Sequence, residues 1–461
     1  SATCSAPYYT CSGFKKAGEA FELTIRAVTW EADSEQNTDF CSRLHSLTPN
    51  FELNNIVLSH ELRGPTVLGG GTLGSLGVIS TSFTSTNNGE VTIANQTVSE
   101  TGAFDFTLDL SSVSYLGESL QSSTSEIVGR FYPAYFAVTG NTPSVRNGQD
   151  QDPGPVDSWS CSFTYQDQPF EYSINPQATI VAKNSSGATT NNYDGDYWKL
   201  DDLQDQRSYT DNSSQGPALT EDLTSANVFY DKGVGYDGSA VLTIEDDYFN
   251  YQKSNFTPAA NDAAFSSDMD LELKQGDLTD ATDSVCFQSD AASACRAFTF
   301  SNILGAEVRY GRAVMENAFG PEDANLIIPL RVEYWTGSQF AVNAAANCTG
   351  YSSAEAPPIV LSGYTDNLSA ADTEPQIAGV SGAGDTFLAG QYPAGRAIYL
   401  SAPGIGNDGS VRIRHEFDEW LKYDWNEDGD TSDTVDHPSA TAIFGRYRGH
   451  DRIIYWREVS Q

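Results

Sequence analysis

The side chains best suited to metal chemistry gather in one short segment near the C-terminus. Oxygen-bearing residues alternate there around Gly429. Calcium binds six to eight hard oxygen ligands, and a glycine allows such a loop to bend tightly around the ion. The segment therefore predicts one Ca²⁺ site. Its ligands would be Asp424, Asn426, Asp428, Asp430 and Asp433.

The spacing departs from that of a helix–loop–helix calcium site at the twelfth position. Val435 stands there, where a bidentate glutamate would be required. Asp433 or Asp436 would then supply the last ligand, in a looser loop set among strands. The alternative is an Asp/Asn/Gly turn that needs no metal. Calcium is favoured because carboxylates this close together repel one another unless a cation lies between them.

Sequence patterns for catalysis are sparse, and we expect that the protein is not an enzyme. Residues 69–74 match GxGxxG, but no helical pattern follows, so a dinucleotide site is rejected. His60 begins HELRG, which lacks the second histidine of a zinc protease motif. A glycosidase needs only two nearby carboxylates, so a carbohydrate-active enzyme or a carbohydrate-binding module is kept as an alternative.

The stretch after the acidic loop is rich in arginine and aromatic residues. We predict a strand near Phe444, a tight turn and a final strand. Arginine clusters bind anions, but with 62 acidic residues in the chain, cross-strand pairing with acidic neighbours is favoured. Residues 453–456 are apolar on both faces of a strand, which favours core over a sugar-stacking platform. The arginines are Arg446, Arg448, Arg452 and Arg457.

Short β-rich segments must position these residues. Residues 21–28, 178–183, 241–245 and 326–334 are β-branched or alternating and are bounded by Gly, Asn, Asp or Pro. Such a pattern is typical of antiparallel sandwiches. We therefore expect an all-β fold of tandem antiparallel, Ig-like β-sandwich domains with very little helix. The best helical segment is a turn or two at 416–422.

A chain of 461 residues is too long for one ordinary core. Linker-like sequence at 140–155, and more faintly near 304–305, divides it. We expect β-sandwich domains at 1–132, 133–304 and 305–461, the last with the calcium-type loop and the closing hairpin.

Seven cysteines and no zinc-type spacing indicate disulfides. The odd number implies one free thiol or a partner outside the chain. Disulfides favour an oxidising compartment, and we expect an extracellular or bacterial cell-surface location. The candidate pairs are Cys4 with Cys11, Cys286 with Cys295, and Cys161 with Cys348.

The charge balance limits the partners. With 25 basic and 62 acidic residues, the formal net charge is −37. Such a chain repels nucleic acid and anionic lipid. No apolar run approaches the length of a membrane helix, so we expect no membrane insertion.

Several long motifs resemble one bacterial family. The closing sequence FGRYRGHDRIIYWREV (444–459), preceded by EWLKYDWNEDGD (419–430), is similar to the C-terminal region of the MSHA pilus biogenesis protein MshQ family. Further likeness lies in GRFYPAYFAV (129–138), CSFTYQDQPF (161–170), GAEVRYGRAVMENAFG (305–320) and LSAPGIGNDGSV (400–411).

The resemblance implies a secreted or surface protein with a structural or adhesive role, associated with a type IV pilus of the MSHA type. No enzymatic activity comes with it. Partners would be pilus or other surface proteins, with copies of the chain itself and glycans as further options. One alternative is a self-assembling extracellular filament subunit joined by β-strand exchange.

Overall fold

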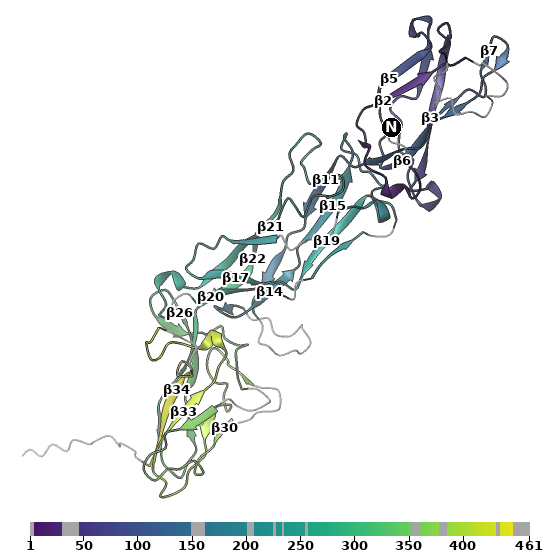
Figure 1. Ribbon diagram of the computed structural model, residues 1–461. Helices are drawn as coiled ribbons and strands as arrows, with labels where there is room; N and C mark the ends of the chain where they lie inside the picture. Colours follow the sequence, from purple (N-terminus) through teal and green to yellow (C-terminus); the bar gives the residue numbers. More distant parts are fainter. Residues whose placement is uncertain are drawn as a thin grey trace, which may run out of the picture.

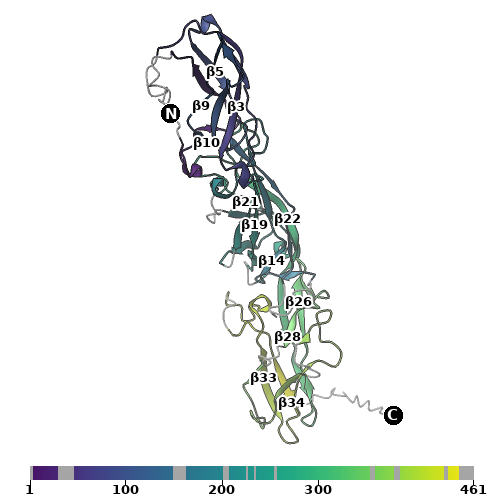
Figure 2. The same ribbon diagram turned by 90° about the vertical axis from the view of Figure 1, so that its right-hand side faces the viewer.

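The computed structural model describes residues 4–29, 46–148, 162–200, 207–224, 227–232, 235–253, 257–352, 359–377, 385–429 and 434–445. The chain forms three β-rich domains that follow one another along an elongated body (Figures 1 and 2). The expected all-β fold of tandem sandwich domains is confirmed. Helical structure in the described ranges is limited to 3₁₀ turns, including Glu419–Leu421 inside the segment predicted to be helical.

The first domain packs a large sheet against a two-stranded one. The large sheet has the order β1-β10-β6-β3-β4, with β9 also on β6, and the small sheet pairs β2 with β5. Alternation explains the packing, because Phe21 and Ile25 of β2 point inward while their neighbours are more exposed. The strands are β1 (Lys15–Lys16), β2 (Phe21–Arg26), β3 (Leu53–Gly64), β4 (Ser80–Phe83), β5 (Glu90–Gln96), β6 (Gly102–Asp109), β7 (Ser114–Tyr115), β8 (Glu118–Ser119), β9 (Ser123–Thr124) and β10 (Val128–Tyr132).

The second domain joins a four-stranded sheet, β11-β15-β19-β18, to a larger sheet, β16-β21-β22-β12-β14-β20-β17, with β13 also on β22. A single core of aliphatic and aromatic side chains fills the space between them. The strands are β11 (Tyr135–Gly140), β12 (Ser144–Arg146), β13 (Thr164–Tyr165), β14 (Phe170–Ile174), β15 (Gln177–Lys183), β16 (Arg207–Asp211), β17 (Ala218–Asp222), β18 (Asn227–Asp231), β19 (Ser239–Glu245), β20 (Tyr248–Gln252), β21 (Phe265–Leu273) and β22 (Phe298–Arg309).

The third domain is built from smaller sheets, of which the largest has the order β24-β34-β33-β29. Pro329 divides the single strand expected at 326–334 into two, because proline cannot donate to a ladder. The strands are β23 (Gly311–Met315), β24 (Ala318–Gly320), β25 (Leu326–Ile327), β26 (Leu330–Trp335), β27 (Phe340–Val342), β28 (Gly350–Ser352), β29 (Ile359–Ser362), β30 (Pro375–Ile377), β31 (Asp385–Thr386), β32 (Ile398–Leu400), β33 (Gly409–His415) and β34 (Ser439–Phe444).

The chain passes between domains without long linkers. After β10 in the first domain, β11 begins the second at Tyr135. At the second passage, β22 runs unbroken through residues 304 and 305, where we placed a boundary, and still pairs with β13 at its end. Only Tyr310 separates β22 from β23 of the third domain. One extended segment therefore crosses from the second domain into the third.

The strand pairings add two details to the expected fold. Not all pairs are antiparallel, since β1–β10, β12–β22, β13–β22 and β24–β34 run parallel. The strand predicted near Phe444 is β34, which is flanked by β33 and, over 442–444, by β24. The tight turn and the final strand of the predicted closing hairpin, together with Arg446, Arg448, Arg452 and Arg457, lie outside the described ranges, so the hairpin stays a prediction.

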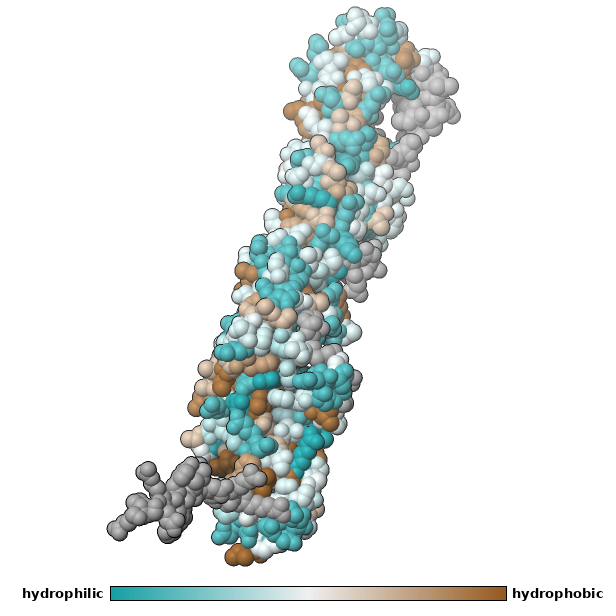
Figure 3. All heavy atoms as spheres, turned by 90° about the vertical axis from the view of Figure 1, so that its left-hand side faces the viewer, coloured by the Kyte–Doolittle hydropathy of each residue, from teal (hydrophilic) through white to brown (hydrophobic). Residues whose placement is uncertain are grey.

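Apolar residues are scattered among polar ones on the face in Figure 3. No helix in the described part of the chain is both long enough and apolar enough to cross a membrane.

Candidate functional site

The predicted calcium loop leaves the third domain between two buried acidic residues. Asp424 at its start is 6% exposed and Asp436 at its end is fully buried. The Tyr423 N–H donates to the Asp436 carbonyl oxygen at 3.1 Å, and this hydrogen bond joins the two ends of the loop. The Asp424 carboxylate accepts the backbone N–H groups of Asp428 at 3.1 Å and Gly429 at 3.0 Å. The first half of the loop is thus a defined turn.

Three of the five predicted calcium ligands lie in the described part of the chain. The Asn426 side-chain amide donates to Asp428 Oδ2 at 2.7 Å, so these two side chains meet, while Asp424 faces the loop backbone. Within the described ranges, no three His, Cys, Asp or Glu residues are grouped closely enough to hold a metal ion. Asp430 and Asp433 lie outside those ranges. The oxygen chemistry of the three described residues suits calcium, and the full ligand set stays a prediction.

An arginine surrounded by aromatic rings anchors the start of this loop. The Arg312 guanidinium carbon lies 3.5 Å from the Phe340 ring centroid. The Tyr423 and Trp425 rings stand 4.9 Å and 5.2 Å from the same carbon. Arg312 also donates from Nε and Nη2 to Glu333 Oε2, at 2.9 Å and 2.7 Å. Because rings and carboxylate together fix the guanidinium, they also fix the residues on either side of Asp424.

A buried lysine of the second domain, Lys253, is hydrogen-bonded to the backbone of the third domain just before the acidic loop. Lys253 Nζ donates to the backbone carbonyl oxygens of Gly311 at 3.1 Å, Trp420 at 2.7 Å and Lys422 at 3.1 Å. It also lies 5.0 Å from the centroid of the Tyr310 ring. The three ammonium hydrogens thus match three carbonyls from two segments of the third domain. The acidic loop therefore starts next to the joint between the second and third domains.

Burial lowers the pKa of the Lys253 ammonium from 10.5 to about 8. Asp167 and Glu419 oppose this shift through their negative charges. The Lys253 backbone N–H donates to Asp167 Oδ1 at 3.1 Å, so this carboxylate is held beside the joint. The ammonium is therefore costly to bury and is held by neutral carbonyls and more distant charges.

A segment of the second domain is interlocked with the third at the same joint. Phe163 and Tyr165 belong to the hydrophobic core of the third domain, although Thr164 and Tyr165 pair with β22. The Asn343 side-chain amide donates to the Tyr165 hydroxyl at 3.1 Å. A side chain at Gly311 would collide with the Tyr165 ring, so glycine is required where the two meet. Separating the domains would expose these aromatic rings.

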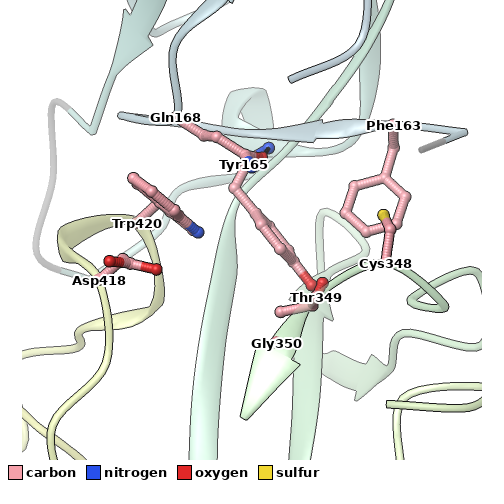
Figure 4. A pocket seen from close by; sticks show the side chains of 8 residues that line it. All are labelled: Phe163, Tyr165, Gln168, Cys348, Thr349, Gly350, Asp418 and Trp420. Carbon is pink, nitrogen blue, oxygen red and sulfur yellow. Dashed lines mark hydrogen bonds between the residues drawn. The ribbon is translucent and has the colours of Figure 1, made fainter. Parts of the chain in front are cut away.

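A small cavity lies at this interlock (Figure 4). Tyr165 points toward Thr349 across it, and Asp418 and Trp420 approach from another segment of the third domain. Its volume of about 10 Å³ is at the lower limit for one water molecule and far below that of a sugar. The lining residues are Phe163, Tyr165, Gln168, Cys348, Thr349, Gly350, Asp418 and Trp420.

A buried ion pair fixes the joint between the first and second domains. Arg130 Nη2 in β10 lies 2.6 Å from Asp283 Oδ2, and the two side chains are 0% and 3% exposed. Arg130 Nε also donates to the Cys11 carbonyl oxygen at 3.0 Å. Burial raises the pKa of Asp283 above its ordinary value, although the hydrogen bond from Arg130 opposes the shift. The arginine links the N-terminal segment, the first sheet and the second domain.

A second set of polar contacts reinforces this joint. The Asn192 side-chain amide donates to the carbonyl oxygens of Thr72 and Thr101, both at 2.8 Å, and its Oδ1 accepts the Thr72 N–H at 2.7 Å. The Glu100 carboxylate accepts the N–H groups of Asn191 at 3.1 Å and Asn192 at 3.2 Å. Burial raises the pKa of Glu100. These bonds cross from the first domain to the second.

Two of the predicted disulfides are present, Cys4–Cys11 and Cys286–Cys295. The second holds a segment that covers a sheet edge, because the Phe136 N–H donates to the Cys286 carbonyl oxygen at 2.8 Å. Cys348 is disulfide-bonded. Its predicted partner Cys161 lies outside the described ranges, so that pairing stays a prediction.

The hydrogen bonds of His415 and His437 are to backbone groups. His415 is buried, with Nδ1 3.1 Å from the Glu416 carbonyl oxygen and Nε2 2.7 Å from that of Tyr351. His437 Nδ1 accepts the Phe417 N–H at 3.1 Å. Burial lowers the pKa of both histidines. Their hydrogen bonds fit structural roles.

The joint residues are absent from our sequence-based set. The sequences around Lys253 and Arg130 contain no recognisable site motif. The only hint is that basic residues are few in this acidic chain. A lysine or arginine inside an otherwise apolar or aromatic strand pattern is the available signal, as in residues 129–132. Their partners lie far along the chain, so the pairing itself had no local signature.

Taken together, the geometry defines a class of protein: an elongated row of β-sandwich domains with packed polar joints. Three family models match in order along the sequence, namely DUF6701 second domain at residues 1–97, third domain at 100–302 and fourth domain at 309–459. The chain belongs to the DUF6701 family. The third-domain match begins before β6, although β6 and β10 pair within the sheet of the first structural domain.

Comparisons with solved structures give distant similarities. The I9-I11 tandem from titin is 6% identical, with 93% of this chain and 95% of that chain covered and a TM-score of 0.21. The insect immune protein hemolin is 10% identical, with 94% and 97% covered and a TM-score of 0.16. Because both TM-scores are low, the assignment of tandem β-sandwich domains rests on the strand pairings of this chain. No curated protein matches the chain.

Proposed function

We propose that this protein is a stiff stalk at the bacterial surface, with a structural or adhesive role in a type IV pilus of the MSHA type. The observation that carries the proposal is the pair of packed joints, which hold three sandwich domains in one elongated body (Figure 2). The pilus association rests on the resemblance of the closing motifs to the MshQ family.

Stiffness follows from what bending would expose. Opening the joint at Lys253 would separate an ammonium from three carbonyls, and opening the joint at Arg130 would separate a buried ion pair. Each unsatisfied buried polar group costs about 1–3 kcal/mol, and a broken buried ion pair costs more. A joint of this kind favours one angle between its two domains.

An extracellular location is supported by the disulfides and the acidity. The Cys4–Cys11 and Cys286–Cys295 disulfides would persist in an oxidising compartment. A net charge of −37 keeps long chains apart and soluble outside the cell.

Calcium would add to the stiffness of the same region. When bound, the ion would neutralise the acidic loop that begins at Asp424, next to the backbone carbonyl of Lys422 that receives the Lys253 ammonium. Asp424, Asn426 and Asp428 are the described residues that would hold it, with Asp430 and Asp433 as further ligands.

Small-angle scattering combined with pilus fractionation tests the proposal. We expect the purified chain to scatter as one extended particle, and variants at Lys253 or Arg130 to scatter as flexible ones. Antibody against the chain should detect it on sheared MSHA-type pili. A wild-type chain that scatters as freely jointed domains would overturn the stalk, and its absence from pili and from the cell surface would overturn the location.

A further inference from the structure

The guanidinium of Arg130, in β10, lies between two segments that are each held by a disulfide. On one side, Arg130 Nε donates to the Cys11 carbonyl oxygen at 3.0 Å, and Cys11 is bonded to Cys4. On the other side, Arg130 Nη2 lies 2.6 Å from Asp283 Oδ2, just ahead of the loop closed by Cys286–Cys295. Two disulfides therefore flank an arginine that joins the first domain to the second.

The first disulfide brings together two contacts with the beginning of β10. The Cys4 N–H donates to the Ile127 carbonyl oxygen at 3.0 Å, directly before β10, and the Cys11 carbonyl oxygen accepts from Arg130 within it. The segment 4–11 thus bonds to the chain at both 127 and 130, and the disulfide holds the two ends of the segment together. A closed loop loses less conformational entropy than an open one when it makes both contacts.

The same segment also contacts the second domain. The ring centroids of Tyr9 and Tyr197 are 6.2 Å apart, in an edge-on arrangement. Lys199 Nζ lies 5.3 Å from the centroid of the Tyr9 ring. The first disulfide therefore supports contacts with both domains of this joint.

The second disulfide supports the turn that carries Asp283. A backbone hydrogen bond at 2.7 Å closes this turn over residues 280–285. At the end of the turn, the Cys286 carbonyl oxygen accepts the Phe136 N–H of β11 at 2.8 Å, and Cys286 is bonded to Cys295. Loss of the disulfide would leave the turn with fewer restraints, and the turn holds the carboxylate that pairs with Arg130.

Both disulfides are open to attack from one side. In each pair one cysteine is buried, Cys4 at 8% and Cys286 at 1% exposed, while Cys11 and Cys295 are half-buried. The thiolate of a dithiol can attack the more accessible sulfur, which breaks the S–S bond and releases the buried cysteine as a thiolate that takes up a proton. The second thiol of the reagent then attacks the mixed disulfide and releases the other cysteine.

We propose that the joint between the first and second domains is locked by thiol oxidation: it holds one angle when both disulfides are formed, and it loosens when a dithiol reduces them. For each disulfide, the dithiol gives two electrons and two protons, two cysteine thiols form, and the reagent becomes a disulfide. The reverse exchange, with a disulfide as the oxidant, locks the joint again. This inference rests on the stiff joint of the proposed function and adds the condition that sets it.

Hydrogen exchange of the full chain, followed by mass spectrometry, tests the lock. The probe is the set of backbone amides in β10, and the amides of β15 report whether the second domain stays folded. The wild type is measured with and without dithiothreitol, a dithiol. The variants are Cys4→Ala/Cys11→Ala, Cys286→Ala/Cys295→Ala and the combination of all four changes. The matched control is Cys348→Ala, which removes a disulfide that does not flank Arg130.

We expect exchange in β10 to be about tenfold faster in each paired variant and faster still in the combined variant and the reduced wild type. Exchange in β15 should be unchanged, and Cys348→Ala should match the wild type. If a variant fails to fold, the reduced wild type still provides the test.

Equal exchange in β10 of the oxidised and reduced wild type would overturn the lock, and so would an equal acceleration in β15, since the second domain itself would then be opening. Small-angle scattering of the same samples separates this inference from the proposed function. Oxidised and reduced chains that are equally extended would overturn the lock and leave the stalk in place. An oxidised wild type that bends freely would overturn the stalk, and the lock with it.

Discussion

Replacing Arg130 by methionine should weaken the joint between the first and second domains by a large and measurable amount. Arg130 and Asp283 are 0% and 3% exposed, so neither charge is screened by water. Arg130→Met leaves the Asp283 carboxylate buried without its cation. Removing one partner of such a pair costs about 3–5 kcal/mol. The free energy of unfolding of the unit that contains this joint should fall by that amount at pH 7.

The double variant Arg130→Met/Asp283→Leu separates the ion pair from simple packing. With both charges gone, no carboxylate is stranded, and most of the lost stability should return. Urea unfolding of the full chain measures the free energies, and small-angle scattering reports whether the joint bends.

The pH dependence provides a further check on this reasoning. Burial already raises the pKa of Asp283, and loss of Arg130 raises it further, because the hydrogen bond from Arg130 lowers it. Protonation at acidic pH removes the stranded charge, so the difference between wild type and Arg130→Met should shrink as pH falls through the raised pKa. A loss below about 1 kcal/mol in the single variant, or an equal loss in the double variant, would refute the account.

Three other outcomes are expected. Burial lowers the pKa of Lys253 from 10.5 to about 8. Between pH 8 and 10.5 the unfolded chain therefore keeps a proton on Lys253 that the folded chain has released. The free energy of unfolding should rise with pH in this range, by up to about 1.4 kcal/mol per pH unit. Thermal unfolding from pH 8 to 10 should show this rise in the wild type and not in Lys253→Met. Calcium should raise the melting temperature of the wild type and a chelator should reverse it, while Asp424→Asn/Asp428→Asn should be insensitive; identical melting in calcium and chelator would count against the site. Mass spectrometry of an unreduced digest should recover a peptide linking Cys161 to Cys348, and a Cys348 peptide linked elsewhere would disprove that pairing.

The architecture could be predicted from the sequence because it depends on local pattern. The β-branched or alternating pattern of residues 21–28 predicted a strand, and β2 lies there with Phe21 and Ile25 facing inward, as β-strand geometry requires. Short loops between cysteines likewise predicted Cys4–Cys11 and Cys286–Cys295. Parallel pairs such as β24–β34 were not predicted, because they join segments far apart in the sequence and leave no local signal.

The joints could not be predicted for the same reason. Lys253 donates to the backbone carbonyl oxygens of Trp420 and Lys422. Every residue has such a carbonyl, so the sequence does not indicate which ones the lysine will contact. The acidic loop was recognised from its spacing, but not its attachment to Arg312 and Phe340, which depends on how β23 and β27 are brought together.

The passage from β22 to β23 through Tyr310 also determines how the molecule would respond to tension. Pulling on its two ends loads residues 298–315 along their length, since this one segment belongs to the sheets of both domains. The ladders of β22 with β21 and of β23 with β26 then resist in shear, with several hydrogen bonds loaded together rather than one after another. Under flow, a stalk built this way would yield within a domain before it yielded at the joint.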